Sequence, residues 1–483
     1  MLKRLGKDIA VYGGTDLLFR TAQLLVVPVY AHQLSLADFG IWSLLTISMA
    51  LLGMLAALGV NSSVQRFYFD PELEAARPKL ISTGFVQLLA SGTLLTLVLL
   101  LVLLGLRSEI EGTAGLSWML VLVALLTLLP DQVSQYFLDS IRLRAAPLKF
   151  VAVGLVRNLG AVAMGLVFLI HFDLGVLGLL LGTLTASSAA VLLGLVLLRQ
   201  DIGFRVDRGA ARKILLYGFP FVLTGAAYWV FGSVGNWMLG ALTTIDEVGL
   251  FAIGMKFSVV MTFLITGFAQ AWTVFAMRLY GEDPDYLRKW SMVFSAWFFL
   301  LALAGLGLAL FAPELLRLLT PPRYWDAAPV LGIAALGLAF FGTQQLTVLG
   351  ISITKKTMLL NHGAWLAAAL AITLNLLLIP RFGATGAALA TMAAYALLTS
   401  FLLFWSQRLH PMPLETGKLL YSVGIVGVGL AAVAVVNGAE VNALNALLKV
   451  ALMLLAIGGA VVVGILNPAH LRALLRRDQV QPS

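Results

Sequence analysis

The sequence predicts an all-α, polytopic membrane protein with fourteen transmembrane helices, arranged as two six-helix lobes followed by two additional C-terminal helices. Composition is the first observation behind this prediction, since 60% of the 483 residues are hydrophobic and only 11% are charged. Ordinary soluble domains have about a quarter charged residues. The second observation is a series of long apolar stretches, and the third is an internal repeat. Because lipid offers backbone groups no partner outside their own helix, the apolar stretches are expected to be helices.

Apolar stretches long enough to span a bilayer core, which takes about 20 residues, recur from Val11 to Leu466. The basic start, Met1 to Lys7, is similar to the n-region of a signal peptide, but the stretch after it carries Asp16 and Arg20. We therefore expect a retained first helix. The other predicted spans are 41 to 61, 81 to 106, 117 to 137, 150 to 170, 175 to 198, 214 to 239, 248 to 272, 291 to 312, 329 to 350, 359 to 379, 385 to 405, 419 to 436 and 447 to 466.

The distribution of Lys and Arg predicts the orientation, because short cytoplasmic loops accumulate these residues. Most of the 32 Lys and Arg residues fall in segments that are cytoplasmic if both termini are inside. Only Arg107, Arg317, Arg323 and Arg381 fall in the outer loops of that topology. The pattern predicts an even number of helices in the cytoplasmic membrane with both termini in the cytoplasm. It also explains the net charge of +9 without a nucleic-acid partner.

An internal repeat predicts the two lobes. The pattern Gly175-x-x-Gly178-x-x-x-Gly182 recurs 208 residues later as Gly383-x-x-Gly386-x-x-x-Ala390. A second landmark, Asp38-Phe-Gly40, recurs at nearly the same spacing as Asp246-Glu-Val-Gly249. Parallel repeats of this kind occur in secondary transporters, which bind their substrate near the bilayer midplane between the repeats.

The repeat and the charge pattern predict the following domains. An N-lobe covers 1–198, a cytoplasmic linker 199–213, a C-lobe 214–406, a second linker and two more helices 407–466, and a cytoplasmic tail 467–483. The linker 199–213 mixes basic and apolar residues, which is typical of an interfacial helix held by anionic lipid. The first additional helix has a face of small residues that favours close packing.

Several segments resemble Wzx-type polysaccharide biosynthesis flippases, which belong to the superfamily that also contains lipid II flippases and MATE exporters. The resemblance is carried by Tyr217 to Gly225, Gly240 to Lys256, Leu34 to Leu45 and Arg381 to Thr391, and by their order and spacing over the whole chain. One departure is Asn236-Trp237, where the family often has an aspartate followed by a basic residue.

The resemblance implies a substrate: an oligosaccharide linked through pyrophosphate to a polyprenol, moved from the cytoplasmic to the outer leaflet for synthesis of a cell-surface polysaccharide such as O-antigen. It also implies membrane lipids as surroundings, a monomer, and a polysaccharide polymerase as a possible partner. The polyprenol is expected to lie along the two additional helices, away from the charged residues of the lobes.

Charged residues inside the predicted spans are the candidates for binding the pyrophosphate, because a charge near the bilayer centre costs about 3 kcal/mol and is usually retained for a function. Asp16 and Arg20 share one helix face at positions i and i+4. Arg20 is predicted to offer phosphate oxygens a guanidinium fork, and Asp16 is either a proton-carrying coupling group or only the partner of Arg20. Lys256, Arg157 and Arg66 are the other candidate cations, with snorkelling or ordinary cytoplasmic placement as the alternative for the two arginines.

Aromatic and amide side chains are predicted to contact the sugars, with packing or lipid contact as the alternative. The candidates are Trp229, Trp237, Gln270 and Trp272. Lys449 is predicted to be an anchor at the outer interface.

Other activities are disfavoured by missing residues. The sequence has no cysteine, which excludes a disulfide framework and a thiolate nucleophile. It also has no Gly-x-x-x-x-Gly-Lys loop for binding ATP. A proton or sodium gradient, the membrane potential or product removal must therefore drive transport. The five histidines show no metal-ligand spacing, so neither a metal nor a catalytic site is predicted. The alternatives kept open are a MATE-type multidrug or cation antiporter and a membrane enzyme such as a polymerase or ligase.

Overall fold

The computed structural model describes residues 2–111, 116–203, 206–436 and 442–466, and within these ranges it contains helices and no strands. The chain packs as two compact units, Met1–Ala252 and Ile253–Ser483. The predicted tail 467–483 lies outside the described residues, as do Phe204 and Arg205 of the predicted linker. The unit boundary differs from the predicted lobe boundary, and the division into lobes at 198 and 214 stays a prediction.

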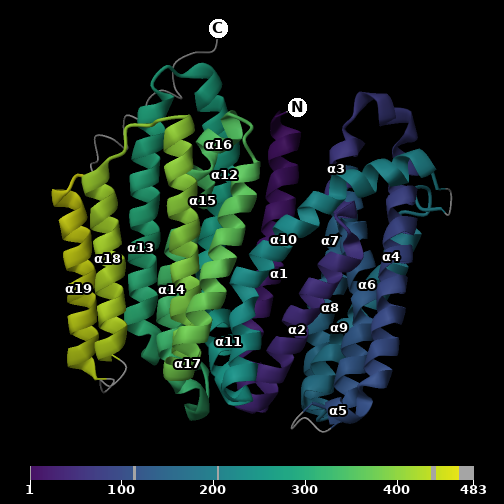
Figure 1. Ribbon diagram of the computed structural model, residues 1–483, viewed down its shortest axis with the longest axis horizontal. Helices are drawn as coiled ribbons and strands as arrows, with labels where there is room; N and C mark the ends of the chain where they lie inside the picture. Colours follow the sequence, from purple (N-terminus) through teal and green to yellow (C-terminus); the bar gives the residue numbers. More distant parts are fainter. Residues whose placement is uncertain (1, 112–115, 204–205, 437–441, 467–483) are drawn as a thin grey trace. The chain divides into compact units, whose positions relative to one another are not determined.

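The first unit is a bundle of long helices joined by short turns (Figure 1). Its elements are α1 (Leu2–Gln33), α2 (Leu36–Ala57), α3 (Val60–Tyr68), η1 (Pro71–Ala76), α4 (Arg77–Gly105), α5 (Arg107–Glu111), α6 (Trp118–Leu143), α7 (Pro147–Gly154), η2 (Leu155–Leu159), α8 (Gly160–Leu166), η3 (Val167–His171), α9 (Gly175–Leu197), α10 (Arg208–Leu242) and the start of α11 (Ile245–Ser258). The turns η2 and η3 are π-helical, so α7 to η3 form one continuous helix with two widened turns.

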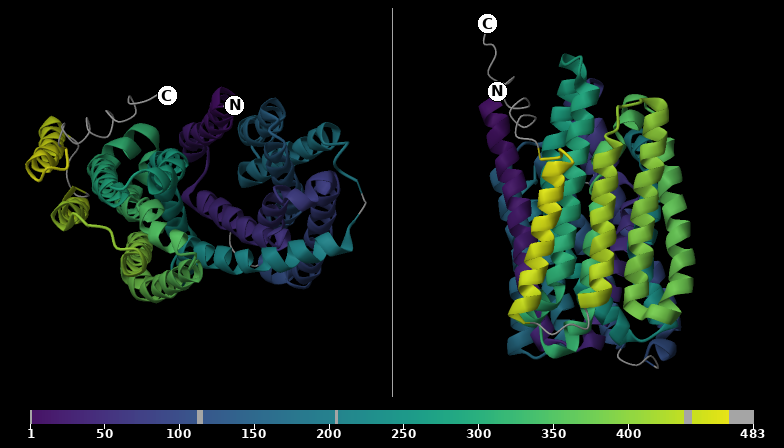
Figure 2. Two further views of the ribbon diagram at one scale, coloured as in Figure 1. Left: turned by 90° about the horizontal axis from the view of Figure 1, so that it is seen from above. Right: turned by 90° about the vertical axis from the view of Figure 1, so that its left-hand side faces the viewer.

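The second unit contains the end of α11 and all later helices. These are α12 (Val260–Glu282), α13 (Tyr286–Leu319), η4 (Pro322–Ala327), α14 (Ala328–Phe341), α15 (Gln344–Thr347), α16 (Leu349–Ile353), α17 (Met358–Leu409), α18 (Thr416–Val436) and α19 (Ala443–Val462). Helix α13 packs against both α14 and α18. Figure 2 shows α18 and α19 running along the same side of this unit.

Twelve helices within the described ranges are long and apolar enough to cross a membrane, which makes the protein a multi-pass membrane protein. Helix α17 counts once among them, although its 52 residues would extend about 78 Å if straight, far more than a bilayer core of about 30 Å. Gly383 breaks it with φ 51° and ψ −132°, and a Cβ at Gly363 would lie 2.8 Å from the Phe401 ring. The two halves of α17 therefore run antiparallel. The count of fourteen stays a prediction.

The break in α17 has a counterpart in the first unit. Gly175, at the start of α9, has φ 53°, and Gly383 has φ 51°. This left-handed conformation is readily adopted only by glycine. A Cβ at Gly178 would lie 2.9 Å from the backbone of Phe168, so η3 and α9 form a hairpin. The glycine pattern in the sequence thus corresponds to a helical hairpin in each unit.

The predicted linker is helical only in its second part. Residues 198–201 form a turn, whereas Arg208 to Lys213 are the first residues of α10. Asp201 is buried and forms an ion pair with Arg144 at the end of α6, and the Asp207 carboxylate lies 3.0 Å from Lys79 Nζ of α4. The linker is therefore attached to the first unit by ion pairs, because its acidic residues find basic partners at the helix ends.

Candidate functional site

Helix α1 carries the predicted pair of charged residues. Arg20 Nε donates to Asp16 Oδ2 over 3.1 Å, one helical turn away. Both side chains remain accessible, with relative exposures of 45% and 44%. The pair uses one N–H group of the guanidinium, so the other N–H groups of Arg20 can donate to an incoming oxyanion.

A second ion pair lies at mid-helix in the first unit. Arg157 Nη2 donates to Asp131 Oδ1 over 2.8 Å, and Arg157 Nε donates to Ser134 Oγ over 3.0 Å. The side chains of Arg157 and Asp131 are 18% and 27% exposed. Arg157 lies in the π-helical turn η2, a type of irregularity that is frequent at functional sites. The alternative that Arg157 only reaches headgroups is disfavoured, because its guanidinium has a carboxylate partner inside the bundle.

A further carboxylate lies two turns beyond Asp131 on α6. Asp139 Oδ2 accepts a hydrogen bond of 2.8 Å from Asn61 Nδ2, and its Oδ1 accepts one of 3.2 Å from Gln135 Nε2. Asp131, Gln135 and Asp139 follow one another at intervals of four residues and therefore form a polar row on one face of α6.

Sequence reasoning missed both carboxylates of this row. Asp131 lies within the predicted span 117 to 137, directly after Pro130, and Asp139 lies just beyond its end. The signal that could have found them is the four-residue spacing of Asp131, Gln135 and Asp139, the same helical pattern that identified Asp16 and Arg20.

The aromatic candidates of the first unit differ in their surroundings. Trp229 Nε1 donates to the carbonyl of Ile47 over 2.9 Å, so this indole joins α10 to α2. Trp237 is 47% exposed. Its neighbour Asn236 is buried and accepts a hydrogen bond of 3.3 Å from Ser43 Oγ, so a neutral contact stands where the family often has an aspartate.

The candidates of the second unit are Lys256, Gln270 and Trp272. Lys256 lies in the last turn of α11 and is half-buried, whereas Gln270 on α12 is exposed. Trp272 is 3% exposed and stacks on Phe268 at 5.6 Å between ring centroids. Because its side chain is buried, Trp272 packs against its neighbours inside the second unit. Arg66, in the first unit, is exposed on α3.

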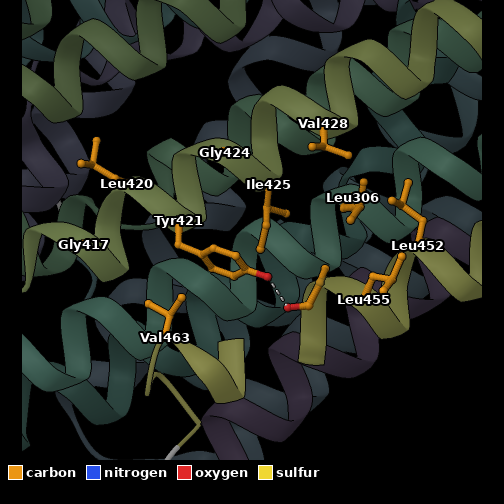
Figure 3. Close-up of a pocket in the computed structure, with 11 residues that line it drawn as sticks. Leu306, Gly417, Leu420, Tyr421, Gly424, Ile425, Val428, Leu452, Leu455 and Val463 are labelled. Atoms are coloured by element: carbon orange, nitrogen blue, oxygen red, sulfur yellow. Dashed lines mark hydrogen bonds between the residues drawn. The ribbon is translucent and has the colours of Figure 1, made fainter. Parts of the chain in front are cut away.

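Two adjoining apolar cavities run along α18 and α19. The first has a volume of about 650 Å³ and is lined by residues of α13, α18 and α19, including Leu306, Gly424 and Leu455 (Figure 3). The second, of about 380 Å³, continues it, because Val428 and Leu452 line both. We call the two cavities together the α18–α19 groove. Tyr421 closes its wall by donating a hydrogen bond of 2.7 Å to the carbonyl of Ala456.

Lys449 lines one end of the groove, and its side chain is only 6% exposed. Its place at the outer interface stays a prediction. Its Nζ lies 2.5 Å from Glu314 Oε1 and 5.7 Å from the centre of the Phe311 ring. The reason is that α13 continues through Glu314 to Leu319 and brings a carboxylate to α19.

Metal binding has no structural support here: within the described ranges, no three His, Cys, Asp or Glu side chains come together in a way that could hold a metal ion.

Residues 5–274 match the family described as Polysaccharide biosynthesis protein. The chain belongs to this family. The matched region includes the Asp16–Arg20 and Asp131–Arg157 pairs, and also Lys256, Gln270 and Trp272. No curated protein sequence gives a significant match.

Solved structures confirm the fold of the family member. A lipid II flippase MurJ in an inward closed conformation matches with a TM-score of 0.71 and 14% identity, over 92% of this chain and 97% of that chain. An inward-facing multidrug resistance MATE transporter of the MOP superfamily matches with a TM-score of 0.62 and 15% identity, over 80% and 94% of the two chains. A MOP superfamily transporter from Pyrococcus furiosus, described by the reverse polarity of its binding pocket, matches with a TM-score of 0.55 and 16% identity, over 84% and 94%.

The matched structures confirm the predicted all-α polytopic fold, and the family match confirms the resemblance to polysaccharide biosynthesis proteins.

Proposed function

We propose that this family member flips an oligosaccharide, linked through pyrophosphate to a polyprenol, from the inner to the outer leaflet of the cytoplasmic membrane. The product would be used for a cell-surface polysaccharide, O-antigen being one example. The single observation that carries this proposal is the α18–α19 groove in a chain of the polysaccharide biosynthesis family. A long apolar groove suits a lipid chain, which packs along it through many van der Waals contacts.

The groove offers the lipid a largely uncharged surface. Its lining is apolar over most of its length, and Lys449, which lines it, is paired with Glu314. A polyprenol placed there leaves the hydration of Arg20 and Arg157 intact, whereas a polyprenol packed on those guanidinium groups would remove water from them at a large cost.

Cations inside the spans support a pyrophosphate headgroup. We propose that Arg20 and Lys256 hold the pyrophosphate together, with Arg157 and Arg66 as further contacts on its route. Arginine suits this role because its planar fork matches two phosphate oxygens. Trp237 and Gln270 are exposed and are proposed to contact the sugars.

A gradient of protons or sodium ions, or the membrane potential, is proposed to drive the transport by alternating access. Asp16 is the first coupling candidate, since it can exchange its Arg20 partner for a proton. We propose a monomer with both termini in the cytoplasm that delivers its substrate to a polysaccharide polymerase.

A MATE-type cation antiporter is the alternative that a specific observation favours. Asp131 and Asp139 place two carboxylates inside the first unit, and carboxylates attract organic cations. Arg157 forms an ion pair with Asp131, however. The pair has no net charge, so Asp131 attracts an organic cation only weakly. Proton-driven efflux of a cationic dye from vesicles would favour the exporter.

The experiment that tests the proposal compares a deletion strain with one carrying the gene. The deletion strain should accumulate lipid-linked oligosaccharide on the cytoplasmic side, and the gene should restore export. Equal distribution of this lipid in both strains would reject the proposed substrate.

A further inference from the structure

The ion pair between Asp131 and Arg157 lies near the middle of α6, a helix that is long and apolar enough to cross a membrane. Helix α6 has 26 residues, from Trp118 to Leu143, and Asp131 stands about 20 Å from its first residue and about 18 Å from its last at 1.5 Å per residue. Charges at such depth usually belong to a substrate or proton pathway. The partial exposure of both side chains, 18% and 27%, shows that the pair is not sealed inside the bundle.

The guanidinium of Arg157 is held along one edge only. Its Nε donates to Ser134 Oγ, and its Nη2 donates to Asp131 Oδ1. These two nitrogens form the same edge of the planar group. The edge formed by Nη1 and the second N–H of Nη2 makes no hydrogen bond to any residue in the described part of the chain, so Arg157 keeps a second fork for an oxyanion.

Asp131 controls what this fork can bind. While Asp131 is ionised, the pair is neutral, and an anion that approaches Arg157 also meets the carboxylate. Protonation of Asp131 removes that repulsion and leaves Arg157 with a full positive charge. Ser187 Oγ lies 3.5 Å from Asp131 Oδ1, within reach to orient the protonated carboxyl.

We propose that Asp131 and Arg157 form a proton-gated anion site, at which a proton on Asp131 frees Arg157 to bind an oxygen of the pyrophosphate. The inference rests on the proposed function for the identity of the anion and adds the group that couples binding to protons. The anion and the proton bind together, so the net negative charge of the occupied site is reduced by one.

The charged groups around Asp131 are compatible with this role. Asp139 and Arg142 lie further along α6, and the guanidinium of Arg142 stands over the Phe150 ring at 4.9 Å. Helix α1, which packs against η2, brings the Asp16–Arg20 pair, whose charges cancel each other. Tyr136 of α6 donates its hydroxyl to the carbonyl of Ile81.

The polar row of α6 offers a route for the proton. Gln135 lies between Asp131 and Asp139, and it donates to Asp139 Oδ1. Asp139 is four residues from Leu143, the end of the helix. The row therefore places polar side chains at four-residue intervals from near this end of the helix to Asp131.

The test measures binding of a pyrophosphate diester that carries N-acetylglucosamine and a short prenyl chain. Such a diester does not titrate near neutral pH, so proton uptake on binding comes from the protein. Titration calorimetry of the detergent-solubilised full chain in buffers of different ionisation enthalpy counts the protons. Wild type should take up close to one proton, and its affinity should rise by up to about tenfold per pH unit as the pH falls.

Three variants separate the alternatives. Asp131→Asn keeps the acceptor oxygen but cannot titrate, so it should bind without proton uptake and with an affinity that does not change with pH. Asp131→Glu should retain the uptake. Asp16→Asn tests the other coupling candidate, which pairs with Arg20, and should retain the proton uptake whatever its affinity. Uptake that persists in Asp131→Asn, or that disappears in Asp16→Asn instead, would overturn the proposal.

Folding is checked by thermal stability before binding is measured. If Asp131→Asn does not fold, infrared difference spectra of the wild type replace it, since binding should produce the band of a protonated carboxylic acid and its absence would overturn the proposal. Failure of the flipping assay with intact proton-linked binding would reject the proposed function and leave this site standing. Flipping without proton uptake would reject this site and leave the function standing.

Discussion

Gly40 and Gly249 make reciprocal contacts. A Cβ at Gly40 on α2 would overlap the carbonyl oxygen of Ile245 at the start of α11, and a Cβ at Gly249 on α11 would overlap the carbonyl oxygen of Leu36 at the start of α2. Each glycine thus packs against the first residue of the other's helix. This exchange of equivalent contacts has the form of a twofold interface, between the two segments that the sequence repeat relates.

Gly40→Ala should destabilise this crossing. The added methyl group has no space beside the Ile245 carbonyl, and overpacking of this kind costs about 1–3 kcal/mol. We expect a lower thermal unfolding temperature in detergent. Gly232→Ala is the matched control, because a Cβ at Gly232 meets nothing within 4 Å. Equal unfolding temperatures for the two variants would contradict the packing described for Gly40.

Asp207, whose carboxylate caps the N-terminus of α10, should make the stability of the fold depend on pH. Hydrogen bonding from the backbone N–H of Ala210 and the neighbouring Lys79 ammonium hold the pKa of the Asp207 carboxyl below its ordinary value of 3.8. Because the folded-state pKa is lowered, the stabilising contribution is fully present above pH 3.8 and is lost as the pH falls through the folded-state pKa.

Asp207→Ala should therefore unfold at a lower temperature than wild type at neutral pH, and the difference should shrink in acid. Thermal unfolding of both proteins across this pH range checks the prediction. A difference that stays constant with pH would show that the charge of Asp207 is not involved.

Filling the α18–α19 groove should impair lipid binding. Gly424 lines the groove and a Cβ there meets nothing within 4 Å, whereas Gly427 has equal space but is absent from the lining. Gly424→Leu should reduce photolabelling of α18 and α19 by a polyprenyl analogue, and Gly427→Leu should not. Labelling that is unchanged in Gly424→Leu would remove the lipid chain from the groove.

The sequence was sufficient for the helical class and for the landmarks of the repeat. Gly175 and Gly383 were recognisable because a left-handed turn between two packed helices selects glycine, and the glycines of the packed faces follow at helical spacing. The pairing of Arg157 with Asp131 could not be predicted, since it depends on how α6 and η2 are rotated against each other. The ion pair of Lys449 could not be predicted for a related reason: the predicted span 291 to 312 ends before Glu314, whereas α13 continues to Leu319.

Substitutions of Arg20 and Asp16 separate the effect of charge from the effect of hydrogen-bond geometry and of proton transfer. Arg20→Lys keeps the charge but loses the planar fork, so flipping should be slowed and not abolished. Asp16→Ala should lower thermal stability if Asp16 only neutralises Arg20. If Asp16 carries protons instead, stability should hold and the pH dependence of flipping should disappear.

The most direct test of the account is the flipping of a pyrophosphate-linked oligosaccharide substrate in vesicles, after the amount and the thermal stability of each variant have been matched. Wild type should flip the substrate, and Arg20→Ala and Lys256→Ala should each nearly abolish flipping while remaining folded. Wild-type rates in both alanine variants would contradict the proposed binding of the headgroup.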